Sequence, residues 1–304
     1  HQSIRQLLLE DGGYDLFTQA QNIPFINMFT YMRPLFNGLI HMEQQNIAHG
    51  DIKDQNIIFN HKNKRMLYID FGLSVHFNKI FDIQRSYHLH YDYLNYPPEH
   101  MIAAHVYRNI KQSNPFDLPT FQIMRYQKNK NFIAQQMQED ITSYFHEEAN
   151  VPKILTQTIN TLKNKIKKET PKMLNRWKTQ YQALTKNKGH IDKKVKKQII
   201  KRIFRPYSSK MDIYGLGGAL FGTLQVNFHY SRKNHELIYW WENKVFYECL
   251  CQLLQDMLEP DPKMRISPPK ALKRFDELNK IRKIKKKNLA YYKTDYEYTK
   301  NNPI

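Results

Sequence analysis

Residues 49–56 of the chain read HGDIKDQN, and residues 70–72 read DFG. Two short apolar runs lie between these stretches, around a polar turn, and this pattern predicts a two-stranded hairpin. Because a hairpin returns the chain, we expect Asp70 to face the loop that carries Asp51 and Asn56. Two carboxylates and an amide would then share one site.

The residue types at these positions suit the handling of phosphate groups. Asn56 and Asp70 supply oxygen atoms, which the hard cation magnesium prefers as ligands. Lys53 lies two residues after Asp51 and can offset the negative charge of a transferring phosphate. Asp51 is the candidate to orient a hydroxyl group and accept its proton. Because phosphoryl transfer depends on positioning and neutralised charge, these four residues form a candidate catalytic set.

The order of several motifs resembles that of the eukaryotic-type protein serine/threonine kinases. HGDIKDQN is similar to the catalytic loop of that family, and DFG is similar to its magnesium-binding triplet. Pro97-Pro98-Glu99 resembles the triplet that closes the activation segment. Residues 212–217, DIYGLG, resemble the start of the buried central helix. Arg265 sits where the family keeps an arginine that pairs with the glutamate of the closing triplet.

The resemblance implies ATP and Mg²⁺ as cofactors, a protein as substrate, and a role for each matched position. Asp51 and Lys53 are the expected catalytic residues, and Asn56 and Asp70 are the expected metal ligands. The opening residues 7–17, LLLEDGGYDLF, look like the hinge between the two lobes of a kinase. The residues expected to contact the nucleotide are Glu10, Gly12, Asp15, Asn56, Ile58 and Asp70. Those expected to hold the site in shape are His49, Phe71, Gly72, Glu99, Asp212 and Arg265.

The expected fold class is α+β and mainly α: a protein-kinase-like C-terminal lobe with a large basic helical insertion. No G-x-G-x-x-G loop occurs in the sequence, so we expect the N-terminal lobe to be absent from this chain. The expected division is a hinge, catalytic loop and activation segment (1–99), an insertion (100–211), the rest of the lobe (212–283) and a basic tail (284–304).

Apolar positions at three- and four-residue steps predict most of the helices. The helix that starts at Asp212 is uncharged beyond that residue, and its glycines imply a closely packed neighbour. Pro152 and Pro171 are expected to mark helix boundaries. The expected helices span residues 24–45, about three segments between 121 and 205, and residues 212–224, 236–258 and 269–283.

Two departures from the family pattern bear on regulation and substrate recognition. Gly50 replaces an arginine that in the family binds the phosphate of a phosphorylated activation loop, so we expect activity without such phosphorylation. Asp92 stands where serine/threonine kinases usually keep a threonine, so the usual bridge between catalytic and substrate-binding loops is missing or substituted. The HGDIK form also occurs in vaccinia-related kinases and in kinases of large DNA viruses, which suggests a viral origin.

Positive charge is concentrated outside the motifs. The formal net charge is +19, and residues 100–211 hold 23 Lys and Arg against 7 Asp and Glu. Residues 280–304 hold 8 against 2. The family needs far fewer residues between Glu99 and Asp212, so we interpret 100–211 as an insertion against the substrate side of the lobe. It is either a solvated helical decoration or an electrostatic surface for nucleic acid, an acidic protein or an anionic membrane.

Two alternatives to an active kinase stay open. A pseudokinase or scaffold could present the basic insertion to a partner, although the intact catalytic set speaks against it. A nucleic-acid-associated module is supported by charge alone. Trp177 and Tyr181 among the lysines could stack on bases, but their four-residue spacing is more simply the packing face of a helix.

The remaining signals concern metals, thiols and location. His88, His90 and Asp92 could ligate zinc, but no further cysteine or histidine cluster completes four ligands. Cys249 and Cys251 lie two apart in a predicted helix and point to different faces, which favours reduced thiols in an intracellular protein. No apolar run reaches the length of a membrane span, so we expect a soluble protein with no transmembrane segment. We expect it to be cytoplasmic or nuclear, and the HGDIK form, the long insertion and the composition suggest that it is virus-associated.

Overall fold

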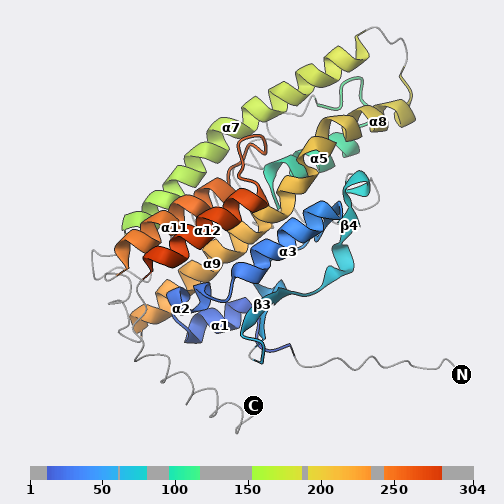
Figure 1. Ribbon diagram of the computed structural model, residues 1–304. Helices are drawn as coiled ribbons and strands as arrows, with labels where there is room; N and C mark the ends of the chain where they lie inside the picture. Colours follow the sequence, from blue (N-terminus) through green and yellow to red (C-terminus); the bar gives the residue numbers. More distant parts are fainter. Residues whose placement is uncertain are drawn as a thin grey trace, which may run out of the picture.

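The computed structural model describes residues 12–60, 62–80, 96–116, 153–186, 191–233 and 243–282. Helices make up most of this part of the chain, and short strands gather at one side of it (Figure 1). The helices are α1 (Leu16–Asn22), α2 (Phe25–Phe29), α3 (Arg33–Gln44), α5 (Pro98–Arg108), α7 (Lys153–Thr185), α8 (Lys193–Phe204), α9 (Met211–Lys233), α11 (Lys244–Met257) and α12 (Pro268–Ile281). The strands are β1 (Ile47–Ala48), β2 (Ile57–Asn60), β3 (Arg65–Tyr68) and β4 (Val75–His76). Short 3-10 turns are η1 (Asp54–Asn56), η2 (Phe71–Leu73), η3 (Phe77–Lys79) and η4 (Arg205–Lys210).

The strands form two antiparallel pairs in the described part of the chain. β2 pairs with β3, with Ile57 opposite Tyr68, and this is the hairpin predicted from the sequence. β1 pairs with β4, with Ile47 opposite His76. Because β1 leads into the HGDIKDQN loop and β3 leads into DFG, the two pairs bring both motifs to the same side of the lobe.

Helix α9 runs through the main core. Leu216, Leu220 and Leu224 are each at most 1% exposed, and α9 packs against α1, α11 and η4. Gly217 allows the close approach of α11, because a β-carbon there would lie 2.9 Å from Met257 Cβ. The close neighbour predicted from the glycines is therefore the end of α11.

Helices α2, α11 and α12 contribute the aromatic part of the same core. The Phe29 ring stacks on Phe275 with centroids 4.2 Å apart and meets Phe246 edge-on at 5.0 Å. Asn227 of α9 is buried and ties this core to the α1–α2 corner. Its Oδ1 accepts from the backbone N–H of Phe25 at 2.8 Å, and its Nδ2 donates to two carbonyls at the end of α1 and just beyond.

A second core lies between α5, α7, α8 and η4. Trp177 has no exposed surface, and its ring lies 4.8 Å from Phe204 and 5.8 Å from Tyr207, measured between centroids. Tyr181, one turn further along α7, packs against Phe116 at 5.4 Å. The four-residue spacing is thus a packing face, and these two rings are not available to stack on bases.

The single helix predicted over residues 24–45 is wrong, because the structure has α2 and α3 there. Pro34 lies in the first turn of α3, where its missing N–H does no harm. In a continuous helix the same proline would remove the hydrogen bond to the Thr30 carbonyl. The Tyr31 carbonyl instead accepts from the Met66 N–H of β3 at 3.1 Å, which ties the turn to the hairpin.

The helix boundary predicted at Pro171 is also wrong, because α7 continues through that residue. Leu155 and Ile159 before it are buried in the main core, and Met173 and Trp177 after it are buried in the second core. Packing on both sides therefore holds the helix together across a residue that removes one of its hydrogen bonds.

Other expectations agree with the structure where it describes them. Helices α11 and α12 lie in the predicted segments, although the described part of α11 begins only at Lys244. Helix α9 begins as predicted but continues to Lys233, beyond the predicted end at residue 224. Residues 117–152, with the boundary expected at Pro152, lie outside the described residues. Cys249 is exposed and Cys251 is buried, so the two thiols face differently as predicted. Over the described ranges, no helix is long and apolar enough to cross a bilayer.

Candidate active site

The loop after β1 carries the residues expected to be catalytic. Its backbone turns at Gly50, whose φ of +79° lies in the left-handed region that glycine tolerates. A β-carbon at Gly50 would lie 2.9 Å from the carbonyl oxygen of Leu73. This loop conformation therefore requires glycine, which gives a physical reason for a residue that departs from the family pattern.

Asp212 anchors the loop from the first turn of α9. Its carboxylate accepts the backbone N–H groups of His49 at 2.7 Å and Gly50 at 3.1 Å. Burial raises the pKa of the Asp212 carboxyl, and the two N–H donors oppose that shift. The buried helix thereby holds the backbone at the start of HGDIKDQN.

His49 is fully buried and joins the loop to the DFG segment. Its Nδ1 accepts from the Asp51 N–H at 3.3 Å, so Nε2 carries the ring proton and donates to the Ile69 carbonyl at 3.0 Å. Ser74 Oγ donates to the His49 carbonyl at 3.2 Å. The Phe71 ring lies 4.7 Å from the imidazole. These contacts set the distance between the two motifs.

The Asp51 carboxylate receives two hydrogen bonds at one oxygen. Lys53 Nζ and Asn56 Nδ2 each lie 2.9 Å from Asp51 Oδ2. Asn56 Nδ2 also donates to the Asp51 backbone carbonyl at 2.9 Å. Because the amide nitrogen of Asn56 is directed at Asp51, its Oδ1 is the atom that could hold a cation. The Asp51 and Lys53 side chains are 12% and 19% exposed, so both can be reached from solvent.

Asp70 reaches the same region from the end of the hairpin. The Ile69 N–H donates to the Asn56 carbonyl at 3.0 Å, which places the next residue beside the loop. Asp70 has φ 61° and ψ 66°, a left-handed conformation uncommon outside glycine, and its Oδ1 accepts from the Gly72 N–H at 3.3 Å. The Asp70 side chain is exposed beside the loop of Asp51.

The donor atoms of Asn56 and Asp70 fit a bound Mg²⁺. This cation keeps several waters and takes only one or two protein carboxylates together with phosphate oxygens. Within the described part of the chain, no group of three or more His, Cys, Asp or Glu could hold a metal. The arrangement therefore suits a cation that arrives with a nucleotide, and not a metal held by the protein alone.

Three other residues expected to contact a nucleotide meet at strand β2. Asp15 forms a β-bridge with Ile58, and its side chain caps α1 by accepting the Thr18 N–H at 2.7 Å. Gly12 lies against the same strand, because a β-carbon there would lie 2.3 Å from Ile58 Cδ1. Glu10 lies outside the described residues, as do His88, His90 and Asp92.

A buried ion pair supports the lobe behind the site. Arg265 Nη1 and Nη2 lie 2.6 Å and 2.9 Å from the two carboxylate oxygens of Glu99, and neither side chain is exposed. Arg265 also donates to the backbone carbonyls of Glu259 (2.8 Å), Lys210 (2.8 Å) and Pro260 (3.1 Å). All five guanidinium N–H groups therefore have acceptors. The pair expected from the resemblance is present.

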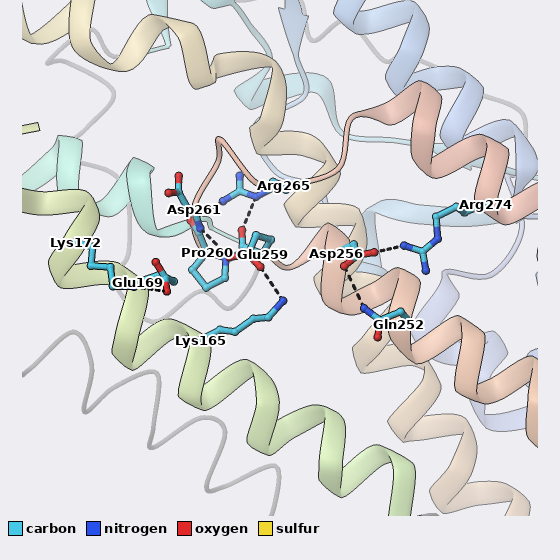
Figure 2. Close-up of polar contacts among 10 residues, drawn as sticks. All are labelled: Lys165, Glu169, Lys172, Gln252, Asp256, Glu259, Pro260, Asp261, Arg265 and Arg274. Carbon is cyan, nitrogen blue, oxygen red and sulfur yellow. Dashed lines mark hydrogen bonds and ion pairs between the residues drawn. The ribbon is translucent and has the colours of Figure 1, made fainter. Parts of the chain in front are cut away.

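Several contacts of this arrangement gave no signal in the sequence. Ser74, Glu259 and Asp261 belong to no motif, yet Ser74 holds the catalytic loop and the other two lie in the loop that holds Arg265 (Figure 2). Figure 2 also shows Lys165 of α7 directed at Glu259. Ser74 lies 25 positions from His49 and Lys165 lies 94 positions from Glu259, so local spacing carried no information about these two contacts.

A helical lobe that presents an acid, a lysine and an amide beside a DFG hairpin has the architecture of a protein kinase catalytic lobe. The protein kinase domain family model matches residues 9–275, and the chain belongs to this family.

Two curated relatives match parts of the chain. It is 41% identical over 64 residues to a probable serine/threonine-protein kinase cdc7 of Dictyostelium discoideum, over 21% of this chain and 6% of that protein. It is 31% identical over 75 residues to a non-specific serine/threonine protein kinase Cdc7 of Drosophila melanogaster, over 25% of this chain and 10% of that protein. The matched part thus spans a tenth or less of either relative. No solved structure matches the chain.

Proposed function

We propose that the chain is the catalytic lobe of a protein serine/threonine kinase, which transfers the γ-phosphate of ATP to a protein hydroxyl. The supporting observation is the convergence of Lys53 and Asn56 on the Asp51 carboxylate, with Asp70 placed beside the same loop. In this role Asp51 orients the substrate hydroxyl and accepts its proton.

Lys53 is the group that offsets negative charge during transfer. Its ammonium group lies 2.9 Å from Asp51 Oδ2, so it is held where the hydroxyl and the phosphate would meet. A positioned cation of this kind stabilises charge that develops on the transferred group. A lysine at this offset is the serine/threonine form of the loop, and the names of both relatives agree with that substrate class.

Asn56 Oδ1 and the Asp70 carboxylate would hold Mg²⁺, and Gly12, Asp15 and Ile58 would line the nucleotide side. The metal, when bound, supplies charge neutralisation on the phosphates. The Asp70 carboxylate is exposed, and its Oδ1 accepts from the Gly72 N–H, so Oδ2 is the oxygen that would meet the cation. Gly50 offers no cation for an activation-loop phosphate, so the proposed activity does not depend on that modification.

The test is transfer of labelled γ-phosphate to a mixture of protein substrates by the full-length protein with Mg²⁺. Asp51→Ala and Asp70→Ala should each lower the transfer rate at least about a hundredfold. The matched control is Asp276→Asn, which removes an exposed carboxylate of α12 that pairs with Arg33, and this variant should keep the wild-type rate. If the wild-type protein and both active-site variants transfer equally little phosphate, the result would instead favour a scaffold.

A second candidate function, binding of an anionic partner, is supported by the surface of α7 and α8. Helix α8 carries six Lys and Arg and no Asp or Glu, and α7 carries eight against one acid. The apolar side chains of α8 are buried in the second core, and Lys193, Lys194 and Arg202 on its other side are exposed. Because Trp177 and Tyr181 are buried, this surface would act through charge and not through base stacking.

Binding can be tested without removing the insertion, whose α7 belongs to both cores. The variant is the fourfold Lys→Gln substitution at exposed positions 167, 168, 193 and 194. For nucleic acid, the slope of log affinity against log salt should become shallower by up to about 0.9 for each lost phosphate contact. An unchanged slope and affinity would leave the surface as a solvated decoration.

A further inference from the structure

Helix α7 packs along α11, so the inserted segment is part of the lobe and not an appendage to it (Figure 1). Leu155 and Ile159 from its N-terminal half are buried in the main core. Gln255 Nε2 of α11 donates to Thr158 Oγ1 at 3.3 Å. This contact surface leads along α7 toward the loop that joins α11 to α12.

Two cations of α7 reach that loop. Lys165 Nζ lies 2.8 Å from Glu259 Oε2, and Arg176 Nη1 and Nη2 lie 2.7 Å and 2.9 Å from the two oxygens of Asp261. The two cations are eleven residues apart, about three helical turns, so they project from the same face of the helix. Both partners lie on the same short loop, which is therefore held at two points by one helix. Figure 2 shows the contact of Lys165 with Glu259.

The same loop holds the arginine of the buried ion pair. The Glu259 and Pro260 carbonyls accept from the Arg265 guanidinium, and the Arg265 N–H donates to the Asp261 carbonyl at 3.0 Å. Arg265 then binds Glu99 through both carboxylate oxygens. The contacts therefore run without interruption from α7, through the loop, to the first turn of α5.

The contacts of α7 to the loop differ from an ion pair that lies within the helix. Asp261 is 10% exposed and Glu259 12%, and the Arg176 pair is bidentate, a geometry that gives directed and comparatively strong bonds. Lys172 and Glu169 also pair on α7, but Lys172 is 58% exposed and both residues belong to the same helix. That pair holds nothing outside α7 and serves as an internal control.

We propose that Arg176 and Lys165 are positioning residues, which hold the 259–265 loop so that Arg265 fixes Glu99 and the end of the activation segment that precedes α5. The insertion would then act on the substrate side of the lobe through this loop. The consequence for substrate rests on the kinase activity proposed above, whereas the mechanical link from α7 to Glu99 does not.

Hydrogen–deuterium exchange on the full-length protein, without ATP, tests the link directly. Arg176→Ala should raise the exchange rate of amides in residues 98–108 and 259–266 about tenfold or more, because the loop loses its bidentate anchor. Arg176→Lys, which keeps the charge and one hydrogen bond, should give an intermediate rate. Lys172→Ala should match wild type in both segments.

The outcomes separate the link from general loss of structure. If Arg176→Ala raises exchange in α3 and α12 as much as in residues 98–108 and 259–266, the variant has unfolded. The test then rests on whether Arg176→Lys raises exchange in those two segments while Lys172→Ala does not. Wild-type exchange in residues 98–108 in the double variant Lys165→Ala/Arg176→Ala would overturn the proposal. So would loosening confined to residues 259–266.

Kinetics supply the second readout. Arg176→Ala should raise the KM for a protein substrate about fivefold while the KM for ATP stays within about twofold, which a general loss of folded enzyme would not produce. Equal changes in both constants would contradict a positioning role. If the wild-type protein transfers no phosphate but the exchange pattern appears, the kinase proposal fails and the link stands.

Discussion

Arg265 and Glu99 are 166 positions apart in the chain and meet as a bidentate ion pair that has no exposed side-chain surface. The pair joins the loop after α11 to the first turn of α5, and the Arg265 guanidinium also lies 4.7 Å from the Tyr214 ring of α9. Three separate parts of the lobe therefore depend on one side chain.

Removing either partner should destabilise the fold strongly. Glu99→Gln should lower the free energy of unfolding by about 3 kcal/mol, because the guanidinium is left buried without a counter-charge. Arg265→Met should cost more, about 4–5 kcal/mol, because the Lys210, Glu259 and Pro260 carbonyls also lose their donor. Chemical denaturation measures both values.

The exposed ion pair of Arg33 and Asp276 is the control for that series. Its side chains are 51% and 39% exposed, so Arg33→Met should change the free energy of unfolding by less than about 1 kcal/mol. A loss at Arg265 no larger than the loss at Arg33 would show that the buried pair does not hold the lobe together.

Two glycines of α9 should respond in opposite directions to the same substitution. Gly217→Ala places a methyl group 2.9 Å from Met257 Cβ and should lower the free energy of unfolding by about 1–3 kcal/mol. Gly222→Ala meets nothing within 4 Å and should raise it by about 0.5–1 kcal/mol through helix propensity. Thermal unfolding of the two variants measures both changes. A higher stability in Gly217→Ala would rule out the close α9–α11 contact.

Buried His100 should make the protein sensitive to mild acid. Burial lowers its pKa to about 4 from the ordinary 6.5, so the folded state resists a proton that the unfolded chain accepts. The stability that comes from keeping His100 neutral is fully present above pH 6.5, its pKa in the unfolded chain, and is lost as pH falls from 6.5 toward 4. Between pH 7.5 and pH 5 the loss should be about 2 kcal/mol.

The measurement is chemical denaturation at both pH values for wild type and His100→Gln, which removes the titrating ring. The difference in stability between the two pH values should shrink by about 2 kcal/mol in the variant. Identical pH dependence in the two proteins would show that His100 is protonated in the fold without cost.

Gly50 should not tolerate a side chain. Gly50→Ala puts a β-carbon at positive φ and 2.9 Å from the Leu73 carbonyl oxygen, and it should lower the free energy of unfolding by about 1–2 kcal/mol or more. The strain acts on the backbone N–H that binds Asp212, so the catalytic loop should shift as well. Unchanged stability in a denaturant titration would show that the loop adopts another conformation.

Local motifs in the sequence predicted the catalytic loop and the hairpin, and the family resemblance predicted the Arg265–Glu99 pair. The hairpin is two short apolar runs around a polar turn, and the structure pairs those runs as β2 and β3. Asp51, Lys53 and Asn56 are close along the chain, so a single loop brings them together. The arginine pair came only from the family resemblance, because no local pattern joins residues that far apart.

Predictions failed where tertiary packing overrides local signals. A proline is a sound reason to end a helix, but two buried faces hold α7 across Pro171. The apolar spacing of residues 24–45 is helical throughout, so it did not show the break after Phe29. The pairing of Arg176 with Asp261 had no signal at all, because lysines and arginines are common along residues 100–211.

The most direct measurement is the kinetics of Asp51→Asn in the full-length protein, with labelled ATP and Mg²⁺. This variant keeps the shape of the side chain and removes the carboxylate that faces Lys53 and Asn56. The expected result is a kcat at least about a hundredfold lower with a KM for ATP within a few-fold of wild type. A kcat equal to that of wild type would contradict Asp51 as the catalytic base.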